Sequence, residues 1–295
     1  MQEQLDASDA PRTAVLWMLF GSFCFGTMNA LVKWTSMHAD VWMIIMVRSA
    51  VIAFAVAAFA ASRGISLKVN NRRIMFLRCA VGLTAMVLYF TALARISIGQ
   101  AVTLQYTAPL FVALLSGKVL AEKVSAGVSL LVITAFTGII LIVSPDLGSV
   151  EPDALIALGS GFFAALAYMY VRELRTTDSP TSVVFWFAIA SVAGSIVQAA
   201  PDLLSLDTKT LAALVGIGIG AGGGQVGITM AYQSANAAWV SAFSYFTVIV
   251  AVFYGFIVFG ETLSTADWIG GLLVVGSGVA LVFMVPPEVE KTSQH

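Results

Sequence analysis

The most unusual chemical group in this apolar chain is the guanidinium of Arg48, which lies seven residues inside a long apolar segment. At ~1.5 Å per helical residue it is about 10 Å deep. An arginine at the centre of a membrane span costs on the order of 2.5–3.5 kcal/mol, so its side chain should face protein or water. Two interpretations stay open: a ligand for a carboxylate or phosphate, or a structural group that holds helix-end carbonyls or reaches the surface. Arg78, a few residues inside the next segment, is expected to reach the surface.

Polar side chains recur on two later apolar segments, at spacings of three and four residues that place them along one helix face. Hydrogen bonding between helices is one explanation, and the lining of a polar cavity is the other. A proline in the first group removes a backbone hydrogen bond and would leave a carbonyl free for a ligand. We expect one central space, with Asn29 and Arg48 towards its outer end. The two groups are Gln105, Tyr106 and Pro109, and Ser241, Ser244 and Tyr245.

Residue types that serve enzymes and metal sites are missing from the apolar segments. No Asp or Glu lies in the middle of one, since Glu122 and Glu261 stand at segment ends, so a proton relay has no obvious site. The two histidines, His38 and His295, lie outside, and the two cysteines imply neither a disulfide nor a zinc site. No P-loop, GxSxG or HExxH motif occurs. We therefore expect no enzyme, no ATP-driven pump, and no metal or cofactor.

The elements that must position these residues are transmembrane helices. Of the 295 residues, 59% are hydrophobic and 11% are charged, against about 25% charged residues in soluble domains. Long apolar segments cross the bilayer as helices, so the predicted fold is an all-α integral membrane protein with ten transmembrane helices. A net charge of -1 gives no reason to expect nucleic-acid binding. The predicted helices are Ala14–Trp34, Val41–Ala61, Ile74–Ala94, Ile98–Val119, Val124–Val143, Ala154–Val171, Pro180–Ala200, Leu211–Ala231, Ala237–Phe259 and Thr265–Val285.

Lysines and arginines predict the orientation. With the amino terminus in the cytoplasm, ten of the fifteen lie on the cytoplasmic side, three lie on the other side, and two lie within spans. Positive residues collect on the cytoplasmic side of membrane proteins. The first segment follows an acidic stretch and lacks a basic region and a cleavage site, so we interpret it as a retained helix. The prediction is a multi-pass inner-membrane protein with both termini in the cytoplasm.

The chain also repeats itself. With a shift of 139 residues, 92–143 align with 231–282 without a gap, and a Glu-x-x-Ser follows a helix in both stretches. The predicted repeats are residues 14–143 and 154–285, each with five helices. Because five is odd, the second repeat must run through the membrane in the opposite direction. Inverted repeats are common in secondary transporters, whose binding sites lie at the repeat interface.

The eighth predicted helix is unusually rich in glycine. Small residues let helices approach closely, and glycine also allows a helix to flex or unwind during a conformational change. Under both interpretations a bulky substitution such as Gly223→Leu should be poorly tolerated. The glycines are Gly216, Gly218, Gly220, Gly222, Gly223, Gly224 and Gly227.

Two stretches carry a family resemblance. Residues Ala101–Leu110 and Glu122–Ser125 resemble the fourth helix of EamA-type members of the drug/metabolite transporter superfamily, and Ser244–Tyr245 with Glu261–Ser264 resembles their ninth. The resemblance covers nearly the whole chain and implies two five-helix repeats. Val248 stands where the first half has its proline, so we expect the halves to differ functionally at this level.

The resemblance implies a secondary transporter that moves a small polar metabolite by alternating access. Amino acids or related compounds are the leading class, with export the commoner direction. Uptake of a nucleotide-like or vitamin-like solute is the alternative, and an intramembrane enzyme or a channel is disfavoured. If Arg48 is a ligand, the solute carries a carboxylate or phosphate. The expected partners are this solute and the lipid bilayer, with the protein a monomer or homodimer.

Overall fold

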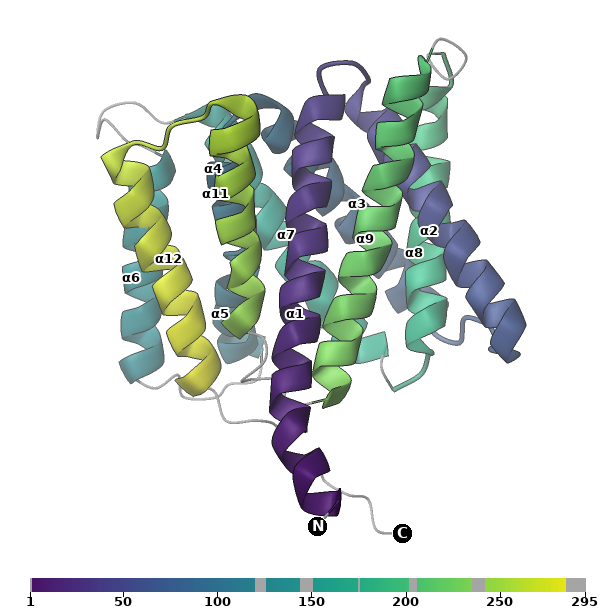
Figure 1. The fold of residues 1–295 in the computed structure, drawn as a ribbon, viewed down its shortest axis with the longest axis horizontal. Coiled ribbons are helices and arrows are strands. Elements are labelled where there is room, and N and C mark those ends of the chain that lie inside the picture. Colours follow the sequence, from purple (N-terminus) through teal and green to yellow (C-terminus); the bar gives the residue numbers. More distant parts are fainter. Residues whose placement is uncertain are drawn as a thin grey trace.

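The computed structural model of the chain describes residues 2–119, 126–143, 151–174, 176–201, 206–234 and 242–284, in which every regular element is a helix. The long helices run roughly side by side (Figure 1). We call the end where α1 finishes and α12 begins the upper end, and the opposite one the lower end. The elements are α1 (Gln2–Thr35), α2 (Val41–Arg63), α3 (Arg72–Arg95), α4 (Ile98–Gln105), α5 (Ala108–Val119), α6 (Ala126–Val143), α7 (Pro152–Leu174), α8 (Pro180–Ala199), α9 (Thr208–Ser234), the 3-10 helix η2 (Ala242–Tyr245), α11 (Phe246–Phe259) and α12 (Thr265–Met284).

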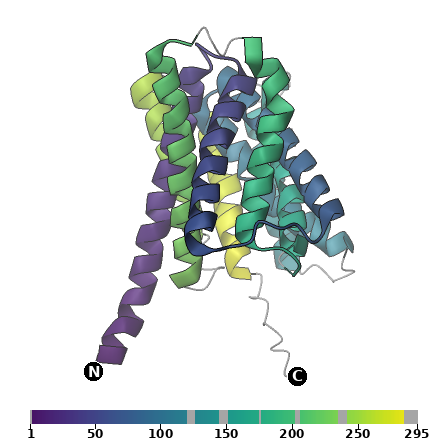
Figure 2. The same ribbon diagram turned by 90° about the vertical axis from the view of Figure 1, so that its right-hand side faces the viewer.

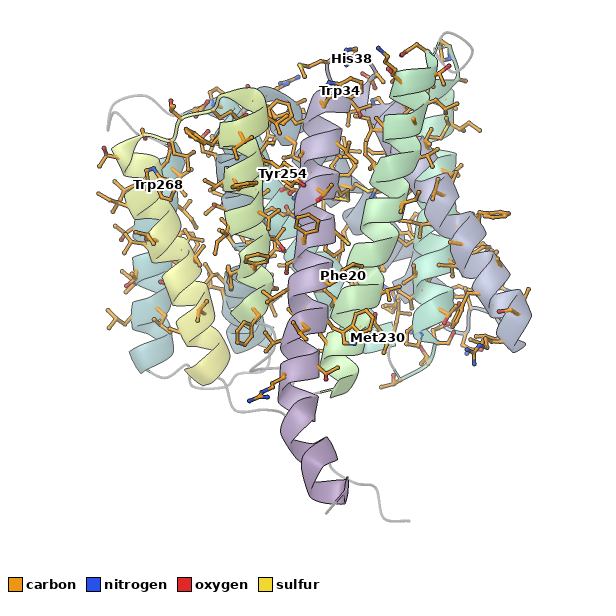
Figure 3. The ribbon with its side chains drawn as sticks, in the orientation of Figure 1. Phe20, Trp34, His38, Met230, Tyr254 and Trp268 are labelled. Carbon is orange, nitrogen blue, oxygen red and sulfur yellow. The ribbon has the colours of Figure 1, made fainter. Side chains whose placement is uncertain are left out.

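The outer faces of these helices are apolar. Phe54, Val197 and Leu272 are 78%, 77% and 69% exposed, which would be unfavourable in water but suits contact with lipid. Trp268 lies at the same kind of outer surface (Figure 3). Within the described residues, six helices are long and apolar enough to cross a membrane: α1, α2, α3, α7, α8 and α9. The predicted all-helical membrane fold is therefore confirmed, and the other four predicted spans correspond to the shorter α4 with α5, α6, η2 with α11, and α12.

The most extensive helix contacts join α1 to α9, α3 to α7, α2 to α8 and α6 to α12. Figure 1 shows α6 and α12 on one flank, α2 and α8 on the other, and α1 with α9 between them. In Figure 2, the start of α1 projects beyond the lower end of the bundle. Each of these four contacts thus joins a helix of the first half of the chain to a helix of the second half.

Glycine allows α1 and α9 to touch backbone to backbone. A Cβ added at Gly227 would lie 2.6 Å from the Cα of Gly21 and 2.8 Å from the carbonyl oxygen of Trp17. A Cβ at Gly21 would in turn lie 3.0 Å from the carbonyl oxygen of Gly224. These contacts agree with the packing interpretation of the glycine-rich helix, because only a missing side chain permits this approach. Gly222 has open space around it.

The predicted single helix Ile98–Val119 is wrong, because the structure divides it into α4 and α5 at Tyr106 and Thr107. Pro109, in the first turn of α5, has no N–H and so cannot make the hydrogen bond that a continuous helix requires there. The Thr107 hydroxyl instead donates to the carbonyl oxygen of Leu104 at 2.6 Å, which closes the end of α4.

The predicted helix Ala237–Phe259 also differs from the structure. Its described part begins with η2, whose 3-10 geometry ends at Tyr245, before α11 continues to Phe259. The first residues of the prediction, 237–241, lie outside the described part of the chain. Tyr245 corresponds to Tyr106 in the repeat alignment, so both halves depart from α-helical geometry at the same place, with a proline nearby in only one of them.

A buried carboxylate joins two connections at the lower end. Asp178, between α7 and α8, accepts hydrogen bonds from the backbone N–H of Asn70 at 2.7 Å and of Asn71 at 3.2 Å, and from the Thr177 hydroxyl at 2.6 Å. Burial raises the pKa of this carboxyl group, but the hydrogen bonds outweigh burial and hold its pKa below the usual value. The connection between α2 and α3 is thereby fixed to the one between α7 and α8.

The α1–α9 contact predicts unequal effects of two alanine substitutions in α9. Gly227→Ala places a methyl group against fixed backbone atoms and should cost on the order of 1–3 kcal/mol, whereas Gly222→Ala enters open space and should cost nothing. Thermal unfolding of the purified protein in detergent should show a lower midpoint for Gly227→Ala alone. Equal midpoints for the two variants would contradict the close packing of α1 on α9.

Candidate functional site

The two irregular helix regions meet through their tyrosines. The rings of Tyr106, at the break between α4 and α5, and Tyr245, at the end of η2, have centroids 5.6 Å apart and planes inclined by 55°. Each tyrosine belongs to a different half of the chain. Backbone that is not α-helical is tolerated inside a membrane only where protein or a cavity surrounds it, so this meeting point is where we look for a site.

Tyr245 carries an unused hydroxyl. Its side chain is only 5% exposed, and its Oη has no hydrogen-bond partner among the described residues. The hydroxyl lies against Gly278 of α12, where any added side chain would collide with it. A buried hydroxyl without a partner is unfavourable, so this group is chemically available to a bound molecule.

The Gln105 side chain is held by α7. The buried hydroxyl of Ser160 donates to Gln105 Oε1. The adjacent Gly161 lets α7 approach the unwound backbone, since a Cβ there would lie 2.9 Å from the carbonyl oxygen of Leu104. Ser160 was not among the predicted site residues. The signal in the sequence was its correspondence with Ser22 at a shift of 138 residues.

Arg48 lies inside the bundle against α3. Its Nη1 donates to the Met86 sulfur at 3.2 Å, and its guanidinium carbon lies 5.9 Å from the centre of the Phe90 ring. Its Nε is buried without a hydrogen-bond partner among the described residues, and neither ion pair of that part of the chain involves Arg48. The Met86 sulfur and the Phe90 ring stabilise a buried positive charge only weakly. The Arg48 guanidinium is therefore still able to bind an anion.

Asn29 and Tyr89 connect the two polar regions. Asn29 is 2% exposed, and its Oδ1 has no hydrogen-bond partner among the described residues. Tyr89 of α3 is within hydrogen-bonding reach of Asn29 and belongs to the same buried cluster as Tyr245, against which Tyr106 packs. Tyr89 was not predicted as a site residue, although it is the one tyrosine in the third predicted span. It places Asn29 in the same neighbourhood as the tyrosine pair.

The remaining predicted site residues are two serines. Ser241 lies outside the described residues. Ser244, in η2, is half-buried, and its carbonyl oxygen accepts a hydrogen bond from the Ser22 hydroxyl of α1 at 3.4 Å. The structure therefore brings the backbone of Ser244 to the helix that also carries Asn29.

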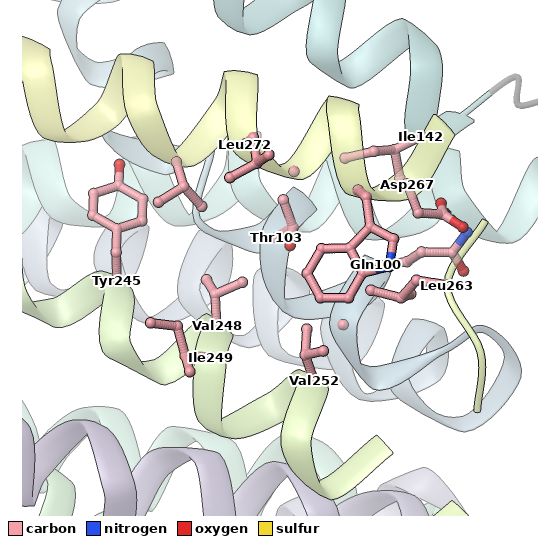
Figure 4. A pocket seen from close by; sticks show the side chains of 14 residues that line it. Gln100, Thr103, Ile142, Tyr245, Val248, Ile249, Val252, Leu263, Asp267 and Leu272 are labelled. Atoms are coloured by element: carbon pink, nitrogen blue, oxygen red, sulfur yellow. Dashed lines mark hydrogen bonds between the residues drawn. The ribbon is translucent and has the colours of Figure 1, made fainter. Parts of the chain in front are cut away.

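A cavity of about 240 Å³ lies between α4, α6, α11 and α12, as Figure 4 shows. Its wall is mostly apolar, with Tyr245 at one end and Gln100 with Asp267 at the other. Ile249 and Leu272 line it and are 63% and 69% exposed, so it opens towards the outer surface. Of the predicted site residues, Tyr245 alone borders this cavity among those described.

A group of ionic contacts closes the upper end. Lys33 Nζ lies 2.6 Å from Glu261 Oε1 and donates to the carbonyl oxygen of Ile96 at 2.5 Å. Glu261 Oε2 accepts from the backbone N–H of Ile98 at 2.9 Å. The end of α1, the connection between α3 and α4, and the connection between α11 and α12 are held together here. The pairing of Lys33 with Glu261 was not predicted, because nothing in the sequence links two residues so far apart in the chain.

Comparisons with known proteins agree with this architecture. The EamA-like transporter family matches the chain twice, over residues 12–144 and 153–284. A pseudopaline exporter of Pseudomonas aeruginosa is 28% identical over 275 residues, covering 92% of this chain and 97% of the exporter. A riboflavin transporter of Vibrio cholerae is 26% identical over 291 residues, covering 97% of both chains.

A solved crystal structure shares the fold. It superposes with a TM-score of 0.62, at 18% identity, over 97% of this chain and 99% of that chain. Such an identity shows the fold alone. The two family matches together span nearly the whole sequence. The chain therefore belongs to the EamA-like transporter family.

Proposed function

We propose that this protein is a secondary transporter that moves a small polar solute with an anionic group, an amino acid or related compound, by alternating access and in the direction of export. The observation that carries this proposal is that three of the predicted site residues have a buried polar atom without a hydrogen-bond partner among the described residues: the Arg48 Nε, the Asn29 Oδ1 and the Tyr245 hydroxyl. An arginine within a membrane span is costly unless it serves a pathway or finds a partner. A solute carboxylate would provide that partner. The names of the relatives, one an exporter and one a vitamin transporter, fit both the leading class and the vitamin-like alternative.

The proposed binding site is the set of seven residues that the sequence suggested. Arg48 binds the anionic group, because its planar guanidinium can make two parallel hydrogen bonds to a carboxylate. Amide and hydroxyl groups replace the hydration that the solute loses on entering the bundle. Tyr89 is added to this set because of its proximity to Asn29 and Tyr106. The residues carried over are Asn29, Arg48, Gln105, Tyr106, Ser241, Ser244 and Tyr245.

The proposed transport mechanism uses two inverted repeats, residues 14–143 and 154–285. Their helices correspond as α1 to α7, α2 to α8, α3 to α9 and α6 to α12. The contact of α1 with α9 then has its counterpart in α7 with α3, while α2 and α6 each pack on their own counterparts. A twofold axis between the halves would produce this pattern, and exchanging the roles of the halves would open the opposite face.

The proposed orientation places the lower end and both termini in the cytoplasm and the upper end outside the inner membrane. The excess of lysine and arginine in the lower connections supports it. In this orientation the contacts of Lys33 and Glu261 close the external side of the path. Transport then requires this ion pair to break during each cycle.

Tyr245→Phe should weaken solute binding without weakening the fold. Removing a buried hydroxyl that lacks a partner leaves stability unchanged or higher, whereas a lost hydrogen bond to the solute should raise the KM by about 2- to 10-fold. The control is Tyr254→Phe, which loses the 3.1 Å contact of its hydroxyl with Thr27 and should lower the melting midpoint at an unchanged KM. An unchanged KM in Tyr245→Phe would remove this residue from the site.

Arg48→Ala should depress transport of anionic and zwitterionic solutes by roughly 10- to 100-fold, because it removes a charge-assisted hydrogen bond, and should affect cations much less. The measurement is uptake and efflux by protein reconstituted in liposomes, with amino acids, nucleotides, vitamins and amines as the panel. Arg63→Ala, at the exposed end of the same helix, is the control. Equal losses for all charges would assign Arg48 a structural role, and failure of the wild-type protein to move any solute would refute transport.

Lys33→Met should favour opening of the upper end, because Glu261 loses the cation that holds it. A cysteine introduced at the buried Thr103, in an otherwise cysteine-free protein, reports this opening. Labelling by a membrane-impermeant maleimide from the upper side should become faster in Lys33→Met than in the parent. Lys209→Met, an exposed position near the same end, should leave the rate unchanged. No acceleration in Lys33→Met would show that the ion pair does not control opening.

A further inference from the structure

The guanidinium of Arg78 does not extend straight to the lower surface of the bundle. It is six residues from the start of α3 at Arg72, which is at the lower end, about 9 Å away along the helix axis. Helical side chains lean towards the helix amino terminus, so both this lean and the pull of water would bring its guanidinium to the lower surface. Its Nη1 instead lies where a side chain of Gly82 would be, one turn further into the bundle. Arg78 is half-buried and two of its three guanidinium nitrogens are buried, so the prediction that its side chain reaches the surface describes it only in part.

The Arg78 guanidinium is packed but not neutralised. Its carbon lies 4.1 Å from the centre of the Phe187 ring of α8, a stacking contact that suits a cation. Its Nε and Nη1 are both buried without hydrogen-bond partners among the described residues, and neither ion pair there involves it. Tyr168 of α7 and the neighbouring Cys79 lie close enough to influence this charge electrostatically. Ring stacking leaves the in-plane N–H groups free for an anion.

Two glycines preserve the space around this group. A side chain at Gly82 would collide with both Arg78 and Phe187, and a Cβ at Gly194 of α8 would lie 2.5 Å from Leu83 Cδ2. Helices α3 and α8 thus come together closely, with the guanidinium between them. A purely structural arginine would be expected to satisfy its donors with helix carbonyls, and the described residues offer no such contact.

Arg78 and Arg48 form two levels along one helix. Arg48 contacts α3 at Met86, whereas the Arg78 guanidinium lies beside Gly82, four residues earlier and about 6 Å lower along the axis. The two cations are therefore suited to hold the same anionic group in turn, first on one side of the path and then on the other.

We propose that Arg78 is a second anion-binding residue, which holds the carboxylate or phosphate of the solute on the lower part of its path, while Arg48 holds it on the upper part. This inference rests on the proposed transport function. It assigns the two arginines to opposite sides: Arg78 governs binding from the lower side, and Arg48 governs binding from the upper side. A structural role for Arg78 would affect both sides alike.

The test has a transport arm and a binding arm. In proteoliposomes of known orientation, initial rates for L-glutamate, L-glutamine and putrescine are measured from each side for Arg78→Gln, Arg78→Lys and the control Arg72→Gln, an exposed arginine at the start of the same helix. In detergent, the purified wild-type protein is treated with phenylglyoxal, and each arginine's labelling is mapped by mass spectrometry with and without L-glutamate or inorganic phosphate.

We expect Arg78→Gln to raise the lower-side KM for L-glutamate roughly 10- to 100-fold, with the upper-side KM and the putrescine rates unchanged. Arg78→Lys should recover part of the loss, since it restores charge but not the guanidinium fork. L-glutamate and phosphate should slow labelling of Arg78. An equal change of both KM values in Arg78→Gln, or anion protection of Arg48 without Arg78, would overturn the inference. Protection of Arg78 in a protein that moves none of the three solutes would refute transport and leave the anion site in place.

Discussion

A polar group inside a lipid bilayer must find a partner, and this constraint shapes the whole molecule. It forces the backbone into helices, and it confines non-helical backbone to the interior, where Tyr106 and Tyr245 face each other. Against this background the unpartnered nitrogens of Arg48 and Arg78 are exceptional. No carboxylate lies in the middle of any span to neutralise them. The proposed anionic solute would supply the partner that these two cations lack.

Close packing holds the helices around the site. Gly21 and Gly227 bring α1 and α9 into backbone contact, and Gly161 brings α7 against the break between α4 and α5. The same glycines leave no space for a larger residue.

The two ends of the bundle are fixed by different chemistry. At the lower end Asp178 accepts hydrogen bonds from the backbone N–H groups of another connection. At the upper end Lys33 and Glu261 form an ion pair between separate elements. The two side chains are only 16% and 15% exposed, so separating them would leave a largely buried charge without its partner.

The sequence by itself determined the all-helical class of fold, the membrane environment and the approximate bounds of the long helices α2, α3, α7 and α8, because apolar length and polar loops record the contact with lipid directly. It also identified Arg48, Tyr106 and Tyr245, since polar residues in apolar segments are visible without a structure. It could not locate the break at Tyr106, because the composition on both sides of Pro109 remains helical in character. Only the tertiary structure decided that Lys33 meets Glu261, that Tyr89 joins Asn29 to the tyrosines, and that Arg78 turns inward. These outcomes depend on which helix lies beside which, and distances between residues far apart in the chain are set by packing rather than by local pattern.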